Sequence, residues 1–576
     1  MNVEQLDADI LIFGAGGAGL LAAVHAHEAD PRLRIVVAVK GLLGQCGCTR
    51  MVQGGYNAVL NPADSLQKHF EDTLRGGAFL NDQDLAWTLV EDAPKRIIEL
   101  ENRLGCLFDR NDEGTIHQKP FAGQSFDRTV HRGDLTGIEI MSNLRDYVLE
   151  SDITVLEDSR GLDLLMSHDR VCGALVLNIR TGRFMVVRAK ATLIATGGAA
   201  TMYRISSPSL EKSGDGMAMA WRAGARFVDM EMVQFHPTGL LVGNSIATGG
   251  LLEEGLRGAG AHLFNGLGER YMSTYDPAKM ERATRDVISR SSYFEIAAGR
   301  GTPHGGVLID ASHLGEDFLL ANFPGMVERC RTYGFDLLHG PVDVSPSAHY
   351  QMGGLEIDVH GRTNVEGLFA AGEDAGGVHG ANRLGGNGVA DSIVYGARAG
   401  DTMTAYVATA GLQDISPAQI HERIEEWSRS LTRDRGENVF ALRQQLEDLM
   451  WRTVGIVRDE AGLQEALGAL GSLQERGRGV KASGDPAFNL EWNEAINLAN
   501  LHVVAELVAR SALCRTESRG AHYRSDWPQS NPEWLKRICL ASDGNGGSTL
   551  SLKPIAFGRL TPTELAGAQP AVRTPP

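Results

Sequence analysis

A glycine-rich junction between a predicted strand and a predicted helix constrains this chain more than any other feature. Within residues 9–28, an apolar run ends in the spacing Gly14-x-Gly16-x-x-Gly19 and continues directly into an Ala/Leu-rich segment. A strand, a tight turn and a helix N-terminus in this order bind the pyrophosphate of a dinucleotide. A glycine-rich turn without a ligand is the alternative, and the regular elements on both sides of the glycines disfavour it.

The end of the second predicted strand distinguishes between dinucleotides. Residues 33–39 form an apolar run that ends at Lys40. NAD sites usually place an acidic residue there, where it binds the ribose. A cation at this position therefore favours FAD with a different ribose contact.

Length, net charge and hydrophobicity argue against a nucleic-acid-binding protein and against a membrane-spanning protein. The chain has 576 residues, enough for several domains, and a net charge of −17. Nucleic acid is excluded as a partner because phosphate binding requires a basic surface. No apolar run reaches the roughly 18 to 20 residues that span a bilayer, and the N-terminus lacks the sections of a signal peptide. We expect a cytoplasmic protein without direct membrane insertion, which meets a membrane only through a partner.

The spacing of the cysteines indicates whether the chain could carry a redox cluster of its own. Their dispersed spacing predicts reduced thiols, and no C-x-x-C series is present to ligate an iron-sulfur cluster or a structural zinc. No metal site is therefore predicted, and another subunit or a small acceptor must take any electrons. The seven cysteines are Cys46, Cys48, Cys106, Cys172, Cys330, Cys514 and Cys539.

Other glycine-rich segments are predicted to reach the same ligand. Residues 41–59 are typical of a loop that passes close to a ligand. A run of predicted strands at 152–195 ends in Thr196-Gly197-Gly198, which directs a second backbone turn toward it. Residues 367–376 predict a strand and a glycine turn, with Glu373 positioned to accept ribose hydroxyls.

Two helices are predicted beside these turns. The segment after residue 212 predicts a helix with Ser213 or Asp215 as N-cap and Gly224 as C-cap. A second helix begins near Gly388, where its N-terminus could stabilise charge on a reduced flavin.

The pattern along the chain predicts an α/β fold with additional domains. The α/β alternation breaks at 240–345, which we interpret as an inserted domain. Charged helical periodicity follows at 412–515 and is consistent with a helical bundle. Residues 516–576 predict short strands and turns that end in a disordered Pro/Ala tail, GAQPAVRTPP.

A set of short motifs, in one order over nearly the whole chain, carries a family resemblance. The chain resembles the flavoprotein subunit of succinate dehydrogenase and fumarate reductase, and its relative L-aspartate oxidase. QFHPTG and HGANRLG are the most specific of the matching motifs. The full set is GAGGAGL, ATGGA, GDGMAMAWRAG, DMEMVQFHPTG, EGLRGAG, RD at 285–286, AHYQMGG, GLFAAGE, HGANRLGGN and ESRGAHYRSD.

The resemblance implies the architecture and the reaction. It implies a Rossmann-like FAD-binding domain at 1–239 and 346–411, and an inserted α+β capping domain at 240–345 that closes over the active site. A helical domain at 412–515 and a small C-terminal domain at 516–576 complete the chain. The implied reaction is hydride transfer between flavin N5 and a carbon of a small C4-dicarboxylate substrate, with an iron-sulfur protein subunit as electron partner.

The resemblance also implies roles for individual residues. His236, His349 and Arg383 correspond to the family's carboxylate-binding residues. Arg285 corresponds to the proton-transferring arginine, with Glu254 and Arg257 as its relay toward solvent. The cofactor-binding residues are Gly14, Ala15, Gly16, Gly17, Ala18, Gly19, Lys40, Cys48, Thr49, Gln53, Gly54, Gly55, Ala195, Thr196, Gly197, Gly198, Asp215, Glu373, His379, Asn387, Gly388 and Val389.

Two positions depart from the family pattern. Membrane-bound members attach FAD covalently to a histidine six residues before a Gly-Gly pair, and counting back from Gly54 gives Cys48. We therefore expect non-covalent FAD, with a cysteinyl link through Cys48 or Cys46 as the alternative. Glu253 occupies the position of a family threonine that binds a substrate carboxylate. An ionised Glu253 would repel that group unless it is protonated or turned away. As a substrate-binding residue, Glu253 therefore predicts a modified dicarboxylate, or a substrate with an amine or hydroxyl that it binds.

The leading functional hypothesis is the interconversion of fumarate and succinate, or of a close analogue. The first alternative is an L-aspartate oxidase-like enzyme that passes electrons to oxygen or fumarate, which Glu253 and the missing histidine favour. The second alternative is a non-catalytic flavin-binding subunit. The full set of matching polar residues disfavours the second alternative.

Overall fold

A parallel sheet organises the computed structural model, which describes residues 3–543 and 547–567. Strand β1 pairs in parallel with β2 and β9, and β16 pairs with the C-terminal end of β9. Strand β6 flanks β2, and the antiparallel β7–β8 hairpin extends the sheet beyond β9. The strands are β1 Glu4–Phe13, β2 Ile35–Ala38, β6 Thr154–Leu156, β7 Ser159–Ser167, β8 Arg170–Asn178, β9 Arg183–Ile194 and β16 Leu368–Ala370.

Helices pack closely on this sheet. The helix predicted near Gly388 is α11 (Asn387–Val407), and it lies against α1 (Gly17–Ala29). Glycine permits this approach, because a Cβ on Gly396 would lie 2.4 Å from the Ala18 carbonyl oxygen. Further helices in the same part of the chain are α2 (Leu66–Gly76), α3 (Gln83–Asn102) and α4 (Thr136–Glu150), and α4 also packs on α1.

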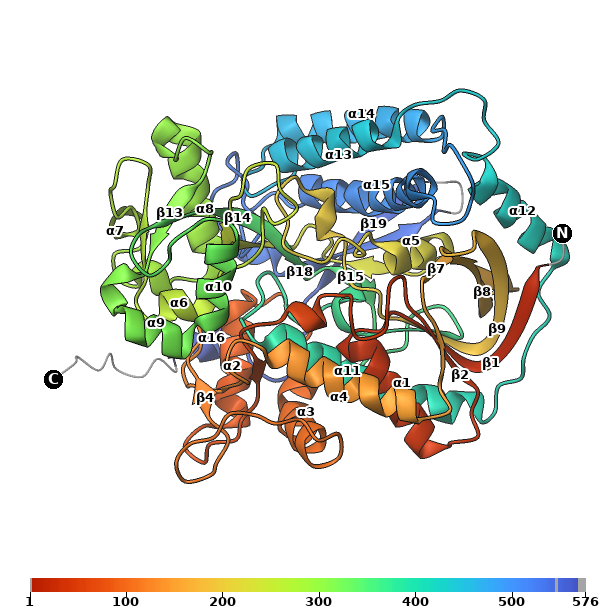
Figure 1. The fold of residues 1–576 in the computed structure, drawn as a ribbon, viewed down its shortest axis with the longest axis horizontal. Helices are drawn as coiled ribbons and strands as arrows, with labels where there is room; N and C mark the ends of the chain where they lie inside the picture. Colours follow the sequence, from red (N-terminus) through yellow and green to blue (C-terminus); the bar gives the residue numbers. More distant parts are fainter. Residues whose placement is uncertain (1–2, 544–546, 568–576) are drawn as a thin grey trace.

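The segment predicted as an inserted domain contains a second hydrophobic core. Its buried residues run from Leu240 to Val344. That core lies on the four-stranded sheet β11-β14-β13-β12, and Figure 1 shows the segment in green at one end of the molecule. The boundaries 240–345 remain a prediction, which this separate core supports. The elements are β11 Val233–Leu240, α6 Glu254–Gly258, β12 His262–Phe264, α7 Met272–Tyr275, α8 Arg285–Glu295, β13 Val307–Asp310, α9 Glu316–Asn322, α10 Pro324–Thr332 and β14 Val342–Gln351.

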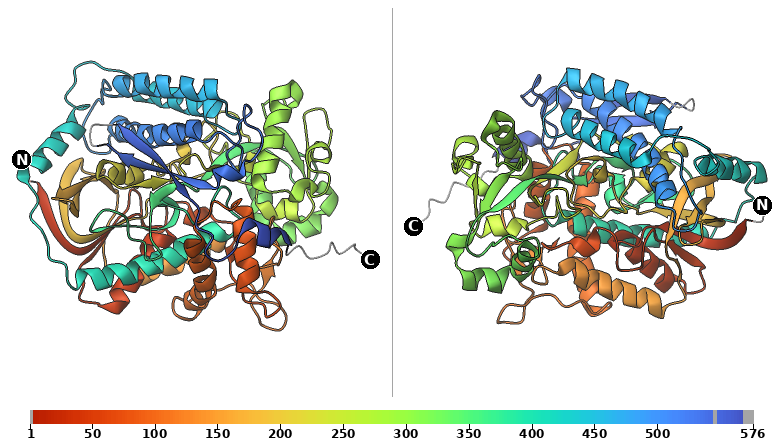
Figure 2. Two further views of the ribbon diagram at one scale, coloured as in Figure 1. Left: turned by 180° about the vertical axis from the view of Figure 1, so that it is seen from behind. Right: turned by 45° about the horizontal axis from the view of Figure 1, so that its top comes forward.

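The C-terminal third is helical and then forms strands, as the periodicity predicts. Helices α13, α14 and α15 pack together along one side of the molecule (Figure 1), and the β18–β19 hairpin lies on the back (Figure 2). The predicted disordered tail lies, from residue 568 onward, outside the described residues. The elements are α12 Pro417–Ser428, α13 Val439–Thr453, α14 Glu460–Gly477, α15 Leu490–Cys514, β18 Lys536–Ser542, β19 Ser548–Pro554 and α16 Pro562–Gly567.

The predicted caps of one helix are wrong. Helix α5 (Asp215–Arg222) has Gly214 as its N-cap, without a side-chain cap hydrogen bond, and Ala223 as its C-cap. Asp215 cannot cap the helix because its carboxylate accepts hydrogen bonds from Arg160 and Ser213. Gly224, with φ of 85°, lies one residue beyond the C-cap, where a left-handed residue commonly ends a helix.

Candidate active site

A cavity of about 1190 Å³ lies where the main sheet meets the inserted segment. The ends of β1, β2, β9 and β16 contribute to one wall, and residues of β11, α6 and α8 contribute to the other. Ligands of open α/β sheets bind at this edge, outside the carboxyl ends of the strands. The volume exceeds the ~300–1,000 Å³ of common small-ligand pockets, as a site shared by a dinucleotide and a substrate requires.

Most of the residues predicted for the site line this cavity. The catalytic and substrate-binding candidates among them are His236, Glu253, Glu254, Arg285, His349 and Arg383. The cofactor candidates among them are Gly14, Ala15, Gly16, Gly17, Ala18, Lys40, Cys48, Thr49, Gln53, Gly54, Gly55, Ala195, Thr196, Gly197, Asp215, Glu373, Gly388 and Val389.

Five predicted residues lie behind the cavity wall. A Cβ on Gly19 would lie 1.9 Å from the Gly14 carbonyl oxygen, and a Cβ on Gly198 would lie 2.6 Å from Glu373 Oε1. His379 Nε2 lies 3.3 Å from the Tyr350 hydroxyl. Two further side chains have protein partners: Asn387 Oδ1 accepts from Asn57, and Arg257 Nη1 donates to the Glu281 carbonyl. These five residues support the wall and do not form it.

The first glycine turn leaves space for phosphate at the start of α1. Gly14 adopts φ of 103°, and a Cβ there would lie 2.1 Å from the Ala195 carbonyl oxygen. The Gly17 N–H donates to Thr49 Oγ1 over 3.1 Å, which joins the turn to the glycine-rich loop. Backbone N–H groups at a helix N-terminus favour an anionic group there.

Two charged cofactor candidates in the cavity lining, Lys40 and Glu373, form ion pairs with other side chains of the protein. Lys40 Nζ lies 3.1 Å from Asp215 Oδ2, and it also donates to Ser213 and Asn497. Burial lowers the pKa of Lys40 to about 8, with Arg160 adding to the effect and Asp215 opposing it. Glu373 forms an ion pair with Lys212, so one of its oxygens is engaged before any ribose hydroxyl binds.

Cys48 lies in the wall beside Lys212. Burial raises the pKa of the Cys48 thiol above its usual value, and Lys212 offsets this only in part. The neutral thiol is a poor nucleophile, since the thiolate is the reactive form.

We predict that acid precipitation of the purified holoprotein releases all of its flavin. The measurement is the flavin absorbance of the supernatant and of the washed pellet. Yellow colour that remains in the pellet would contradict the prediction, and its loss in either Cys48→Ser or Cys46→Ser would identify the cysteine that carries the link.

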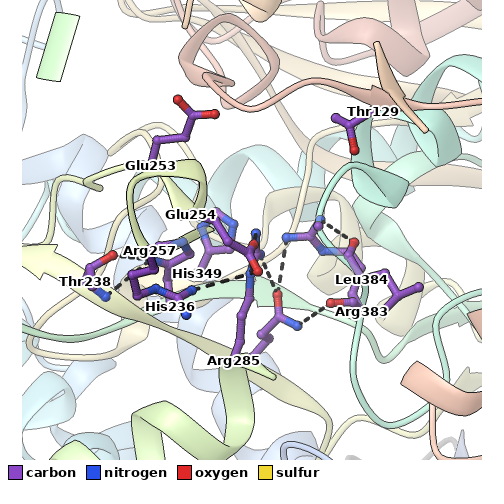
Figure 3. A network of polar contacts seen from close by, with 12 residues as sticks. Thr129, His236, Thr238, Glu253, Glu254, Arg257, Arg285, His349, Arg383 and Leu384 are labelled. Carbon is purple, nitrogen blue, oxygen red and sulfur yellow. Dashed lines mark hydrogen bonds and ion pairs between the residues drawn. The ribbon is translucent and has the colours of Figure 1, made fainter. Parts of the chain in front are cut away.

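Arg285 is the central cation of the substrate end of the cavity. It begins α8, and its Nη2 and Nε donate to Glu254 Oε2 over 2.5 and 2.9 Å (Figure 3). Glu254 begins α6, so the two helices meet through this ion pair. Burial raises the pKa of Glu254, but Arg285 and Arg257 outweigh it and the net pKa is lowered. Glu254 is therefore ionised at neutral pH.

Gln234 joins the two cavity arginines. Its Oε1 accepts from Arg285 Nη1 over 3.0 Å and from Arg383 Nη2 over 3.2 Å. Its amide nitrogen donates to Asn382 and to the Arg383 carbonyl, each over 2.8 Å, which fixes the orientation of the amide. Arg383 also stacks over the Tyr350 ring at 4.2 Å. Burial lowers the pKa of Arg383 to about 10, which leaves it charged at neutral pH.

Two histidines complete the cluster as neutral donors. The rings of His236 and His349 meet edge to face, with centroids 5.4 Å apart and an interplanar angle of 71°. Burial and the nearby Arg285 hold the pKa of both imidazoles well below the usual value. His236 Nδ1 accepts from the Thr238 N–H over 3.3 Å, so its Nε2 carries the hydrogen and can donate to a ligand.

Glu253 is engaged by a residue that the sequence did not single out. Its Oε1 lies 2.6 Å from Lys119 Nζ, and Figure 3 shows its carboxylate directed away from His236 and Arg285. Glu253 still lines the cavity, so its assignment to the substrate site stays a prediction, and the ion pair with Lys119 supports the turned-away orientation of its carboxylate. Burial raises the pKa of Glu253, and Lys119 acts in the opposite direction.

Sequence reasoning missed several residues of the site. Gln234 and Thr238 lie within the same QFHPTG motif that identified His236. Their closeness to His236 in the sequence could have predicted that they belong to the site. Ser207, which hydrogen-bonds His349 Nδ1 over 2.9 Å, and Lys119 lie outside the motifs and gave no signal.

We predict that Gln234→Leu lowers kcat/KM for the substrate by roughly 10- to 100-fold while FAD remains bound. The apolar side chain has similar volume but no oxygen to hold the two guanidinium groups in register. Steady-state kinetics and the flavin-to-protein ratio provide the measurement. An unchanged kcat/KM would mean that the arginines are positioned without this amide.

Within the described residues, no three His, Cys, Asp or Glu side chains come together as metal ligands would. None of the described helices is both long and apolar enough to cross a bilayer.

Two family profiles match the sequence. The FAD binding domain family matches residues 9–389, and the fumarate reductase flavoprotein C-terminal family matches residues 443–573. One subunit of the CoM/CoB fumarate reductase from Methanothermobacter marburgensis is 42% identical over 543 residues, which are 94% of this chain and 98% of the relative. The fumarate reductase flavoprotein subunit of Escherichia coli is 34% identical over 98% of this chain and 96% of its own length.

Solved structures agree with these relatives. The FrdA chain of a mutant E. coli quinol fumarate reductase superposes with a TM-score of 0.93 at 34% identity, over 98% of this chain and 99% of that one. An adenosine-5-phosphosulfate reductase superposes with a TM-score of 0.79 at 19% identity, over 96% of each chain, a likeness of fold alone.

Proposed function

Because this chain belongs to the family of succinate dehydrogenase and fumarate reductase flavoprotein subunits, we propose that its buried arginine and histidine cluster binds a C4-dicarboxylate and protonates a carbon of it. The protein is an FAD-dependent oxidoreductase that interconverts fumarate and succinate. The observation that carries the assignment of residues is the Arg285–Glu254 ion pair, which lies in the same cavity as the glycine turns.

The residues of the cavity fit FAD. The Gly14 turn and the α1 N-terminus suit a pyrophosphate, and Gly388 in the first turn of α11 lines the same cavity. Bound there, FAD supplies hydride transfer at its N5 atom. Behind the wall, His379 orients the lining residue Tyr350 through a hydrogen bond.

Charge development explains why the cluster contains cations and neutral donors. Hydride addition to fumarate moves negative charge into a carboxylate, which preorganised donors and cations stabilise. In our proposal, Arg383 and the N–H groups of His236 and His349 hold that carboxylate. The low pKa of both imidazoles keeps each of them neutral, so neither takes the proton from the reaction.

Arg285 is the proposed proton donor to the other carbon. Its ordinary pKa lies above about 12, so it gives up a proton only if a partner replaces that proton at once. The Glu254 carboxylate, in contact with Nη2 and Nε, is placed to accept a proton from the solvent side and pass it to the deprotonated arginine, which returns both groups to their starting charge. Arg257 lies further along the relay, with its Nη2 3.8 Å from Glu254 Oε1.

The electron partner and location follow as further parts of the proposal. The relatives are named as subunits, and the cysteines of this chain lack the spacing of cluster ligands. We propose an iron-sulfur protein as the electron partner, and a cytoplasmic location with any membrane contact made through partner subunits.

An assay of two substrates tests the proposal against an aspartate oxidase. The pairing of Glu253 with Lys119 removes the reason to expect an amine on the substrate. With a reduced viologen dye as donor, the protein is expected to consume fumarate, and with L-aspartate and oxygen to form no hydrogen peroxide. Aspartate-dependent peroxide without fumarate turnover would contradict the proposal.

A further inference from the structure

An ion pair outside the arginine and histidine cluster joins the two walls of the cavity. Lys119 belongs to strand β4 (Gln118–Lys119), which pairs with β5 (Thr129–Val130) in the FAD-binding part of the chain. Glu253 directly precedes α6 in the inserted segment, 134 positions away. The 2.6 Å contact between Nζ and Oε1 therefore spans the boundary at which the substrate site is formed.

Glu253 needs a counter-ion at this position. Its side chain is 3% exposed, and within the described residues its Oε2 has no hydrogen-bond partner. The other ionisable groups that act on it are the carboxylates of Glu254 on α6 and Asp134 before α4, and both disfavour its ionised form. Lys119 is the cation that opposes them. An uncompensated carboxylate here would repel an incoming dianion.

The pair also sets the charge of the site. Five cations oppose three carboxylates here, which leaves an excess of two positive charges. They are Lys119, Arg257, Arg285, Arg329 and Arg383 against Asp134, Glu253 and Glu254. That excess matches a dicarboxylate dianion. Without Lys119, the excess falls to one while Glu253 is ionised.

We propose that Lys119 is a positioning residue of the dicarboxylate site, which holds the Glu253 carboxylate away from the substrate and cancels its charge. The inference rests on the proposed function and adds a specificity determinant to it. Lys119 does not line the cavity, so it acts through Glu253 and not by touching the substrate.

The test is a comparison of Lys119→Met with Lys119→Met/Glu253→Gln in the FAD-loaded protein, with KM for fumarate measured from pH 6 to pH 9. In the single variant, KM relative to wild type is expected to rise with pH, reaching at least tenfold once Glu253 ionises. In the double variant, the ratio is expected to return to within about threefold of wild type and to be independent of pH, because no carboxylate remains.

Lys553→Met is the matched control. Lys553 forms the same type of pair with Glu356, over 3.2 Å, but its side chain is 60% exposed on β19, and KM is expected to remain unchanged. A KM ratio near one for Lys119→Met at every pH would overturn the proposal. A penalty that persists in the double variant would also overturn it, since Lys119 would then act on substrate or folding directly.

Two readouts separate this inference from the proposed function. Flavin content and the melting temperature identify a variant that has lost its fold, and Lys119→Arg then supplies the charge-conserving comparison. Fumarate turnover by the wild-type protein in the same assay tests the proposed function independently of the variants.

Discussion

Replacing Arg285 with methionine is expected to reduce the kcat for fumarate reduction by roughly 10³- to 10⁴-fold while the protein keeps its FAD. Methionine has a long side chain but neither a proton to donate nor a charge to stabilise the developing carbanion. In our proposal Arg285 donates the proton, and its charge adds to that of Arg383; its contacts to Glu254 and Gln234 hold it in place. The measurement is anaerobic turnover with a dye donor, alongside the flavin-to-protein ratio.

The control for Arg285→Met is Arg282→Met on the same segment. Arg282 is exposed and lies three positions before Arg285, outside the cavity lining. Its replacement is expected to leave kcat within about twofold, as for most surface changes. A kcat of Arg285→Met within tenfold of wild type would mean that another group delivers the proton.

Replacing Gly14 with valine is expected to abolish FAD binding altogether. The backbone at Gly14 has φ of 103°, which a β-branched residue rarely adopts. The added Cβ would also lie 2.1 Å from the Ala195 carbonyl oxygen, at the point where β1 and β9 both turn toward the cavity. The two turns would have to separate, and the phosphate site between them would be lost.

The measurement for Gly14→Val is the flavin content of the purified protein, with circular dichroism to follow the fold. Gly468→Ala serves as the control, since a Cβ at this exposed position of α14 has no neighbour within 4 Å. That change is expected to raise stability by up to about 1 kcal/mol, because alanine favours the helix. A colourless Gly468→Ala protein, or a fully yellow Gly14→Val protein, would contradict this account of the turn.

The features that could be predicted from the sequence are those formed by residues close together along the chain. The strand, glycine turn and helix at 9–28 are adjacent segments, so their spacing is visible without a structure. The N-terminus of α11 near Gly388 was predicted for the same reason, since a glycine-rich loop directly precedes an apolar helical run. Residues inside specific motifs, such as His236 and Arg383, could also be assigned to one cavity.

Contacts between distant segments could not be predicted in this way. Glu253 was recognised as unusual, but its partner Lys119 lies on a two-residue strand without any motif. The caps of α5 were wrong for a similar reason. Asp215 has the chemistry of an N-cap, yet Lys40 and Arg160, which are remote in sequence, occupy its carboxylate. The requirement of a buried carboxylate for a counter-ion outweighs its local preference for the N-cap position of a helix.

The reoxidation of reduced flavin by fumarate tests the central claim most directly. The purified protein is reduced anaerobically, excess reductant is removed, and fumarate is added while the flavin absorbance is followed. The account predicts rapid return of the oxidised spectrum with formation of succinate, and much slower return in Arg285→Met. Flavin that stays reduced in the presence of fumarate, in wild-type protein that retains its FAD, would contradict the account.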